Sequence, residues 1–186
     1  LNLQEQISRI QEMMGILNEK LTLGSSERIH LSKTPIDKVE IRIKNGDVHG
    51  KPGGLWYGFG DNWINFKKYG TPWDTGEGVS LKSLMGDNVY IYKLYLDMSN
   101  ILVLNTRNDY FNFTAKYGTK DFNYPYNINW DLVAKEYKGI EFPNYNELGV
   151  RELYQEVSER YYWTYAIDIN SGCIWDGSAI KKIRLL

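Results

Sequence analysis

Hydrophobic positions at the start of the chain recur with the spacing of an amphipathic α-helix. They step alternately by four and three residues: Leu3, Ile7, Ile10, Met14, Leu17 and Leu21. Polar residues fill the positions between them, and residues 23–26 (Leu-Gly-Ser-Ser) then end the pattern as a linker. We therefore expect residues 1–23 to form an attached helix or leader, and residues 24–186 to form the folded domain. The alternative is a helix that simply packs on its own domain.

The rest of the chain alternates between short strand patterns and short helical patterns. Alternating hydrophobic and polar residues predict strands at 28–32, 55–59, 89–97, 101–104, 138–142, 161–168, 173–175 and 180–186. Helical spacing predicts helices at 63–68, 108–116, 130–137 and 147–160. Residues 69–84 are predicted to form a long surface loop, and residues 170–172 a hairpin turn. Short strands with short helices between them predict an α+β domain.

Composition and charge exclude several classes of protein. The net charge of -1 provides no global basic field, which argues against a binder of single-stranded nucleic acid. The single cysteine, Cys173, excludes an intrachain disulfide and a multi-cysteine zinc site, and its apolar neighbours favour a buried, inert thiol. With two histidines in the chain, we expect no metal centre.

The apolar runs are short as well. None approaches the roughly 20 residues that span a bilayer, so we expect no membrane partner. The N-terminus also lacks the apolar core of a signal peptide. We expect a protein that is not secreted through a signal peptide and that works in a virion or in a host cytoplasm.

The segment 51–63 has an unusual composition, because four aromatic residues lie among four glycines. Glycine packs nothing and costs backbone entropy in a strand, so a plain core strand would not use so many. Gly58 and Gly60 leave room for close approach to the backbone, which suits a flat ring ligand. Trp56 and Tyr57 point to opposite faces of the predicted strand. We expect Tyr57 to face the ligand and Trp56 to face the core; the alternative is a hairpin whose aromatic residues are all core.

His30 and Ser32 lie two residues apart, so they share one face of the predicted strand 28–32. A neutral imidazole donates from one nitrogen and accepts at the other, which suits a ligand hydroxyl that also both donates and accepts. A structural histidine would instead bond to the backbone or to a neighbouring side chain. The sequence leaves both interpretations open.

Together these motifs resemble the ADP-ribosyltransferase superfamily, in its His-Tyr-Glu branch. The resemblance rests on His30-x-Ser32 on a first strand and on Tyr57 on a second, with Trp56 as a competing candidate. It implies split, mostly antiparallel small sheets with NAD bound between them. His30 and Ser32 would bond to the nicotinamide ribose, and Tyr57 would stack on the nicotinamide beside Gly58.

The resemblance also implies a catalytic glutamate on a later strand. Glu141 is the leading candidate, because its strand follows the predicted helix 130–137 as a comparable strand does in such transferases. The family's Glu-x-Glu or Gln-x-Glu motif is missing before the final hairpin, so Asp168 and Asp176 are alternatives. The implied activity is NAD-dependent transfer of ADP-ribose to a protein or nucleic-acid acceptor.

The N-terminal segment resembles leader peptides on proteins of large tailed bacteriophages. Residues 4–7 and 13–19 carry this resemblance, and Leu17-Asn18-Glu19 matches the Leu-x-Glu motif after which a phage head protease cuts. The resemblance implies a phage-encoded effector whose leader contacts capsid or scaffold. The alternative function is a virion structural or interaction protein without catalytic activity, whose many Tyr and Trp residues form a protein-binding face.

Overall fold

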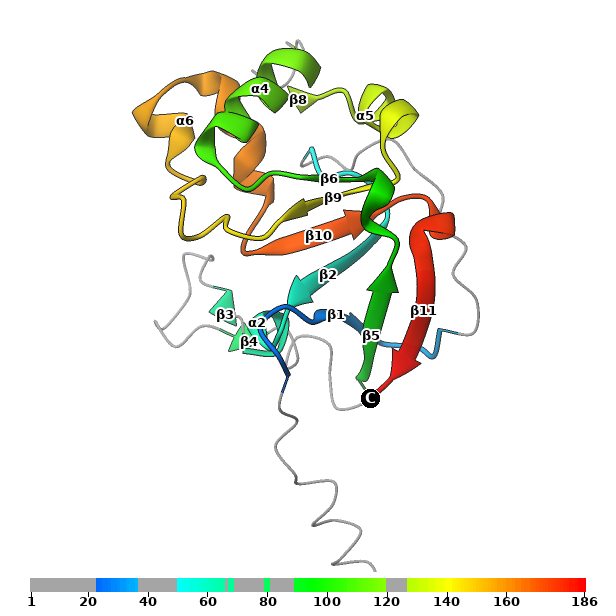
Figure 1. Ribbon diagram of the computed structural model, residues 1–186. Helices are drawn as coiled ribbons and strands as arrows, with labels where there is room; N and C mark the ends of the chain where they lie inside the picture. The colour runs from blue at the N-terminus through cyan, green and yellow to red at the C-terminus, as the bar shows by residue number, and fades with distance from the viewer. Residues whose placement is uncertain (1–22, 37–49, 66, 69–78, 81–88, 120–126) are drawn as a thin grey trace, which may run out of the picture.

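The computed structural model describes residues 23–36, 50–65, 67–68, 79–80, 89–119 and 127–186 (Figure 1). The predicted leader, up to residue 22, lies outside the described residues, as does most of the predicted loop 69–84. The described part is a mixed α+β fold, which confirms the predicted class.

The centre of the fold is one curled sheet of seven strands within the described residues (Figure 1). In spatial order the strands are β11 (Ile180–Leu185), β5 (Tyr90–Leu96), β1 (Arg28–Ser32), β2 (Leu55–Phe59), β10 (Ser171–Ile174), β9 (Gly139–Phe142) and β6 (Ile101–Val103). Neighbouring strands are antiparallel except β6 and β9, which are parallel. Two small ribbons accompany the sheet: β3 (Lys67–Lys68) with β4 (Val79–Ser80), and β7 (Gly118–Thr119) with β8 (Asn127–Ile128). The expectation of split small sheets is therefore wrong for the described strands of the main sheet.

The helices are short, and several gather over one side of the sheet (Figure 1). They are α2 (Asn62–Asn65), α4 (Arg107–Tyr117), α5 (Trp130–Glu136) and α6 (Leu153–Glu156), with 3-10 helices η1 (Met98–Asn100), η2 (Glu159–Ala166) and η3 (Gly177–Ala179). Thr106 caps α4 in a capping box with Asp109, and Asn129 caps α5 as predicted. No helix among the described residues is long and apolar enough to cross a membrane.

The sheet separates two hydrophobic clusters. The larger cluster joins Ile140, Phe142 and Cys173 of the sheet to aromatic side chains of α4, α5 and η2, including Trp163. The smaller cluster lies on the other face, around Tyr57. Cys173 is fully buried, which confirms the prediction of a buried thiol, and burial raises the pKa of the thiol well above the usual value.

Three sequence predictions near the C-terminal half are wrong. The predicted helix 147–160 is mostly turns, since Gly149 adopts a left-handed φ of 56° that a continuous helix does not allow. The predicted strand 161–168 is largely the 3-10 helix η2, in which adjacent Trp163 and Thr164 are both buried. The predicted turn 170–172 is wrong because β10 already begins at Ser171.

Candidate functional site at one end of the sheet

A cleft of about 580 Å³ lies where β1 and β10 begin and β2, β6 and β9 end. Its lining includes a residue at or near each of these strand ends: Ser26, Phe59, Asn105, Asn144 and Asn170. Arg28 and Glu141 also line it. The cleft thus combines polar amide and hydroxyl groups with one cation, Arg28, and three carboxylates, those of Asp61, Glu141 and Glu147. The space is large enough for a small molecule.

Glu141 is held at the cleft by donors from two other strands. Its Oε1 accepts a hydrogen bond of 2.5 Å from Arg28 Nε and one of 2.7 Å from the Tyr57 hydroxyl. Its Oε2 accepts one of 3.2 Å from Arg28 Nη2. The residue is only 3% exposed, so both partners and the burial fix the orientation of the carboxylate.

The register of the sheet brings Tyr57 to Glu141 across an intervening strand. Gly172 of β10 pairs with Tyr57 of β2 on one side and with Glu141 of β9 on the other. A Cβ at Gly172 would lie 2.4 Å from both Cζ and the hydroxyl oxygen of Tyr57. The tyrosine ring therefore lies directly over this glycine to reach the carboxylate. Any side chain at 172 would block that path.

Burial and the neighbouring carboxylate of Glu141 shift the pKa values of Tyr57 and Arg28. Burial raises the pKa of Tyr57 well above its usual value, and the neighbouring charge of Glu141 raises it further, so the hydroxyl stays protonated and donates. Burial alone would lower the pKa of Arg28, but the hydrogen bond and the charge of Glu141 more than offset it, so that pKa is raised. Arg28 also places its guanidinium carbon 5.9 Å from the centre of the Phe59 ring.

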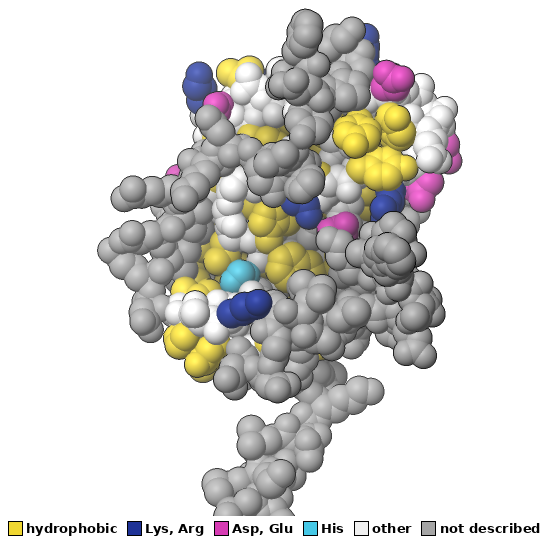
Figure 2. Space-filling view, turned by 180° about the vertical axis from the view of Figure 1, so that it is seen from behind, with side chains coloured by type: hydrophobic (Ala, Val, Ile, Leu, Met, Phe, Trp, Pro, Cys, Tyr) yellow, Lys and Arg dark blue, Asp and Glu magenta, His cyan; other side chains and the backbone are white. Residues whose placement is uncertain are grey.

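His30 does not line the cleft. Strand β1 is paired with β2 at Arg28 and Ile29, and beyond that point the His30 imidazole contacts the backbone of β2 instead. Its Nδ1 lies 2.6 Å from the Trp56 carbonyl oxygen, which can only accept, so Nδ1 carries the proton and donates. Burial lowers the pKa of His30. This backbone partner is the one expected of a structural histidine, and Figure 2 shows a histidine beside hydrophobic side chains on the face seen from behind.

The other residues predicted to bind NAD also have protein partners. The Ser32 hydroxyl donates to the Thr34 carbonyl oxygen at 2.6 Å. The space above Gly58 is filled by the Trp63 ring, whose Cδ1 would lie 2.4 Å from a Cβ at that position. We expected Gly58 to leave room for a ligand; the structure gives that room to Trp63.

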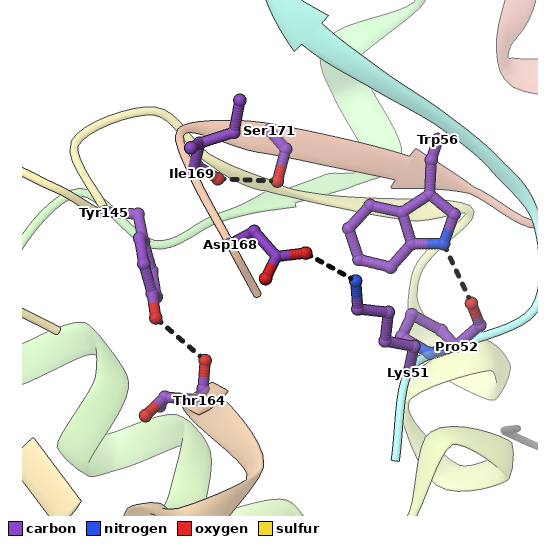
Figure 3. Close-up of polar contacts among 8 residues, drawn as sticks. All are labelled: Lys51, Pro52, Trp56, Tyr145, Thr164, Asp168, Ile169 and Ser171. Carbon is purple, nitrogen blue, oxygen red and sulfur yellow. Dashed lines mark hydrogen bonds and ion pairs between the residues drawn. The ribbon is translucent and has the colours of Figure 1, made fainter. Parts of the chain in front are cut away.

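We expected Tyr57 to face a ligand and Trp56 to face the core; the Tyr57 part is wrong, and Trp56 packs against the larger cluster as expected. Tyr57 has no exposed surface, whereas Trp56 is half-buried on the opposite face of the sheet. In Figure 3 the Trp56 indole donates to the Pro52 carbonyl oxygen, and Lys51 lies beside it. Tyr57 is thus a core residue whose hydroxyl donates a hydrogen bond to Glu141. Its ring does not line the cleft, so it offers no stacking surface there.

The two alternative carboxylates lie elsewhere. Asp168 forms an ion pair of 3.2 Å with Lys51 (Figure 3). Asp176 caps η3 by accepting from the Ser178 amide, and this hydrogen bond lowers the pKa of its carboxyl group. Neither lines the cleft, so Glu141 is the one of the three that does.

Arg28 is the residue of this cluster that the sequence did not single out. Its one signal is its position, since it shares a strand face with His30 and Ser32.

The described residues contain no group of three or more His, Cys, Asp or Glu side chains that could hold a metal ion. Comparisons with models of known protein families, with curated proteins and with solved structures found no match.

Proposed function

We propose that this chain transfers the ADP-ribosyl group of NAD to a protein or nucleic-acid acceptor, with Glu141 as the catalytic carboxylate. The observation that carries the proposal is a buried carboxylate at a cleft, oriented by Arg28 and Tyr57 from two other strands. The cleft volume of about 580 Å³ falls within the range of small-molecule and cofactor sites.

The two oxygens of Glu141 are not equally engaged. Oε1 accepts two short hydrogen bonds, whereas Oε2 accepts the longer one from Arg28 Nη2. A carboxylate oxygen has room for two donors, so Oε2 retains a position for a ribose hydroxyl. That contact would place negative charge beside the ribose ring of NAD.

The reaction breaks the bond between ribose C1′ and the nicotinamide nitrogen, and the electron pair leaves with nicotinamide. Positive charge then grows on the ribose, where the Glu141 carboxylate stabilises it. The acceptor nucleophile forms the new bond to C1′ and loses a proton. Water as the acceptor would give simple hydrolysis of NAD.

Other cleft residues take supporting roles. The Arg28 side chain is 24% exposed, which leaves part of its guanidinium to meet a pyrophosphate oxygen. Phe59 supplies the aromatic wall that the sequence assigned to Tyr57. Tyr57 is a positioning residue, and the contacts of His30, Ser32 and Gly58 within the protein leave them no role in this proposal.

The test uses labelled NAD, the purified chain and a host-cell lysate, with released nicotinamide as a second readout. Glu141→Gln should lower turnover by about a hundredfold or more, the order seen when a group that stabilises transition-state charge is removed. Asp168→Asn is the matched control and should keep the parent activity. A thermal melt of both variants separates lost chemistry from lost folding.

Two results would refute the proposal. One is the absence of NAD binding by the parent protein, seen as no heat in a calorimetric titration and no change of melting temperature when NAD is added. The other is equal turnover in Glu141→Gln and Asp168→Asn.

A second function, protein interaction within a virion, is favoured by a surface group of tyrosines. The rings of Tyr154, Tyr162 and Tyr165 contact one another at centroid distances of 5.3–5.9 Å, and Tyr162 is 39% exposed. Arg151 lies 5.2 Å from the centre of the Tyr165 ring. Tyr and Arg are enriched in protein interfaces. Cross-linking of the chain to capsid components, lost in Tyr162→Ala, would support this function over catalysis.

A further inference from the structure

The outer face of β5 and β11 gathers cations around an exposed tyrosine. The register pairs Tyr95 with Lys182 and Lys93 with Arg184, so these four side chains share one face; we call them the β5–β11 patch. Tyr95 is 37% exposed, and Lys182 and Arg184 are exposed as well. β5 and β11 lie side by side, with β11 at the edge of the sheet (Figure 1).

Within the patch, the Tyr95 ring is flanked by positive charge. The ammonium nitrogen of Lys93 lies 5.3 Å from the ring centre, and that of Lys182 lies 5.9 Å from it. Lys181, at the irregularity that follows Ile180, adds a further exposed cation beside the patch, 3.8 Å from Asp97. An exposed ring between cations is an arrangement that fits alternating bases and phosphates.

We propose that the β5–β11 patch binds single-stranded nucleic acid. Tyr95 stacks on a base, while Lys182 and Arg184 neutralise phosphates on either side of it. Lys93 flanks the ring, and its own charge is paired with Glu27. The near-neutral net charge of the whole chain argued against such binding at the level of the sequence, but phosphate binding depends on the local field of a surface, and this patch gathers several cations. This binding site does not rest on the proposed transferase activity.

Edge-strand protection alone does not account for the patch. Charged residues on an edge strand prevent sheet-to-sheet aggregation, and that explains Lys182 and Arg184 on β11. Lys93 and Tyr95 lie on β5, which is paired on both sides and needs no such protection. Lys93 also forms an ion pair with Glu27, which precedes β1.

The test is fluorescence anisotropy of a labelled oligothymidylate titrated with the full chain at low salt. With two to three cations engaged, the logarithm of the affinity should fall with the logarithm of salt concentration with a slope of about -1.5 to -2. The double variant Lys182→Glu/Arg184→Glu should weaken binding by about tenfold or more. The control Lys135→Glu/Arg160→Glu makes the same change of net charge at exposed sites on α5 and η2 and should bind as the parent does.

The ring is tested separately from the charge. Tyr95→Ala should weaken binding by about five- to a hundredfold, the range for one lost base stack, while Tyr95→Phe should retain it. Equal affinity of the two double variants would overturn the proposal, as would tighter binding of a duplex than of the single strand. A parent protein that shows no saturable binding at low salt would overturn it too.

Discussion

The contact between Tyr57 and Glu141 depends on the absence of a side chain at Gly172, so Gly172→Ala is a direct test of the site. The new methyl group would lie 2.4 Å from the Tyr57 ring and hydroxyl, well inside van der Waals contact. Tyr57 has no exposed surface toward which it could move. We therefore expect the ring to shift against its neighbours and the 2.7 Å hydrogen bond to Glu141 to break.

The expected change in the free energy of unfolding has three contributions, two that destabilise the folded protein and one that offsets them in part. Forcing extra volume into a packed core costs about 1–3 kcal/mol. Losing a hydrogen bond to a charged, buried group costs about 1.5–3 kcal/mol. Replacing glycine by alanine also lowers the conformational entropy of the unfolded chain, which stabilises the folded protein by about 0.4–1 kcal/mol. We expect Gly172→Ala to lower the free energy of unfolding by about 1.5–5.5 kcal/mol, the sum of these three terms.

Urea denaturation of the parent and the variant measures this difference. Gly24→Ala is the control, because Gly24 is exposed and the nearest atom to its added Cβ is a carbon of the partly exposed Glu27 side chain, at 3.4 Å. In a Tyr57→Phe background the hydrogen bond is already gone, so Gly172→Ala should cost less there than in the parent. A Gly172→Ala variant as stable as the parent, or equal costs in both backgrounds, would refute the proposed path of the ring over Gly172.

Two further predictions concern buried groups. Burial lowers the pKa of His30 in the folded state, so the unfolded chain binds the proton more readily than the folded one. The contribution of neutral His30 to the free energy of unfolding is therefore fully present above pH 6.5, and it is lost as the pH falls from there toward the folded-state pKa. Unfolding measured across that range should show this loss in the parent and a flatter profile in His30→Gln; identical profiles would contradict it. Cys173, with no exposed surface and a raised thiol pKa, should react with a thiol reagent only after unfolding, so rapid labelling of the native chain would contradict the packing around it.

The local elements were the most predictable part of the fold. The strands 28–32 and 55–59 were predicted with the bounds that the structure gives them, since side chains alternate between two faces along each. The helix at 130–137 was also predicted, because Asn129 supplies a side-chain cap that the sequence reveals. Where local signals agreed with each other, the structure followed them.

The errors arose where tertiary contacts decide the local conformation. Aromatic residues at 161–165 have the composition of a strand, yet the Thr164 hydroxyl bonds to the carbonyl oxygens of Tyr161 and Val150, which fits a tight 3-10 turn. Gly172 has the composition of a turn, yet it lies within β10 because a ring from the neighbouring strand covers it. Neither contact can be inferred from spacing along the chain.

The arrangement of the candidate site also depends on contacts between distant strands, which the sequence does not reveal. Its three central residues come from β1, β2 and β9, and they meet only because β10 lies between β2 and β9 in the sheet. The sequence proposed Glu141 and Tyr57 separately, by resemblance, and assigned Tyr57 to a ligand. The register instead assigns its hydroxyl to Glu141 and brings Arg28 to the same carboxylate. Strand order therefore determines the chemistry of this cleft, since a sheet with β2 and β9 adjacent would leave no glycine gap for the ring to cross.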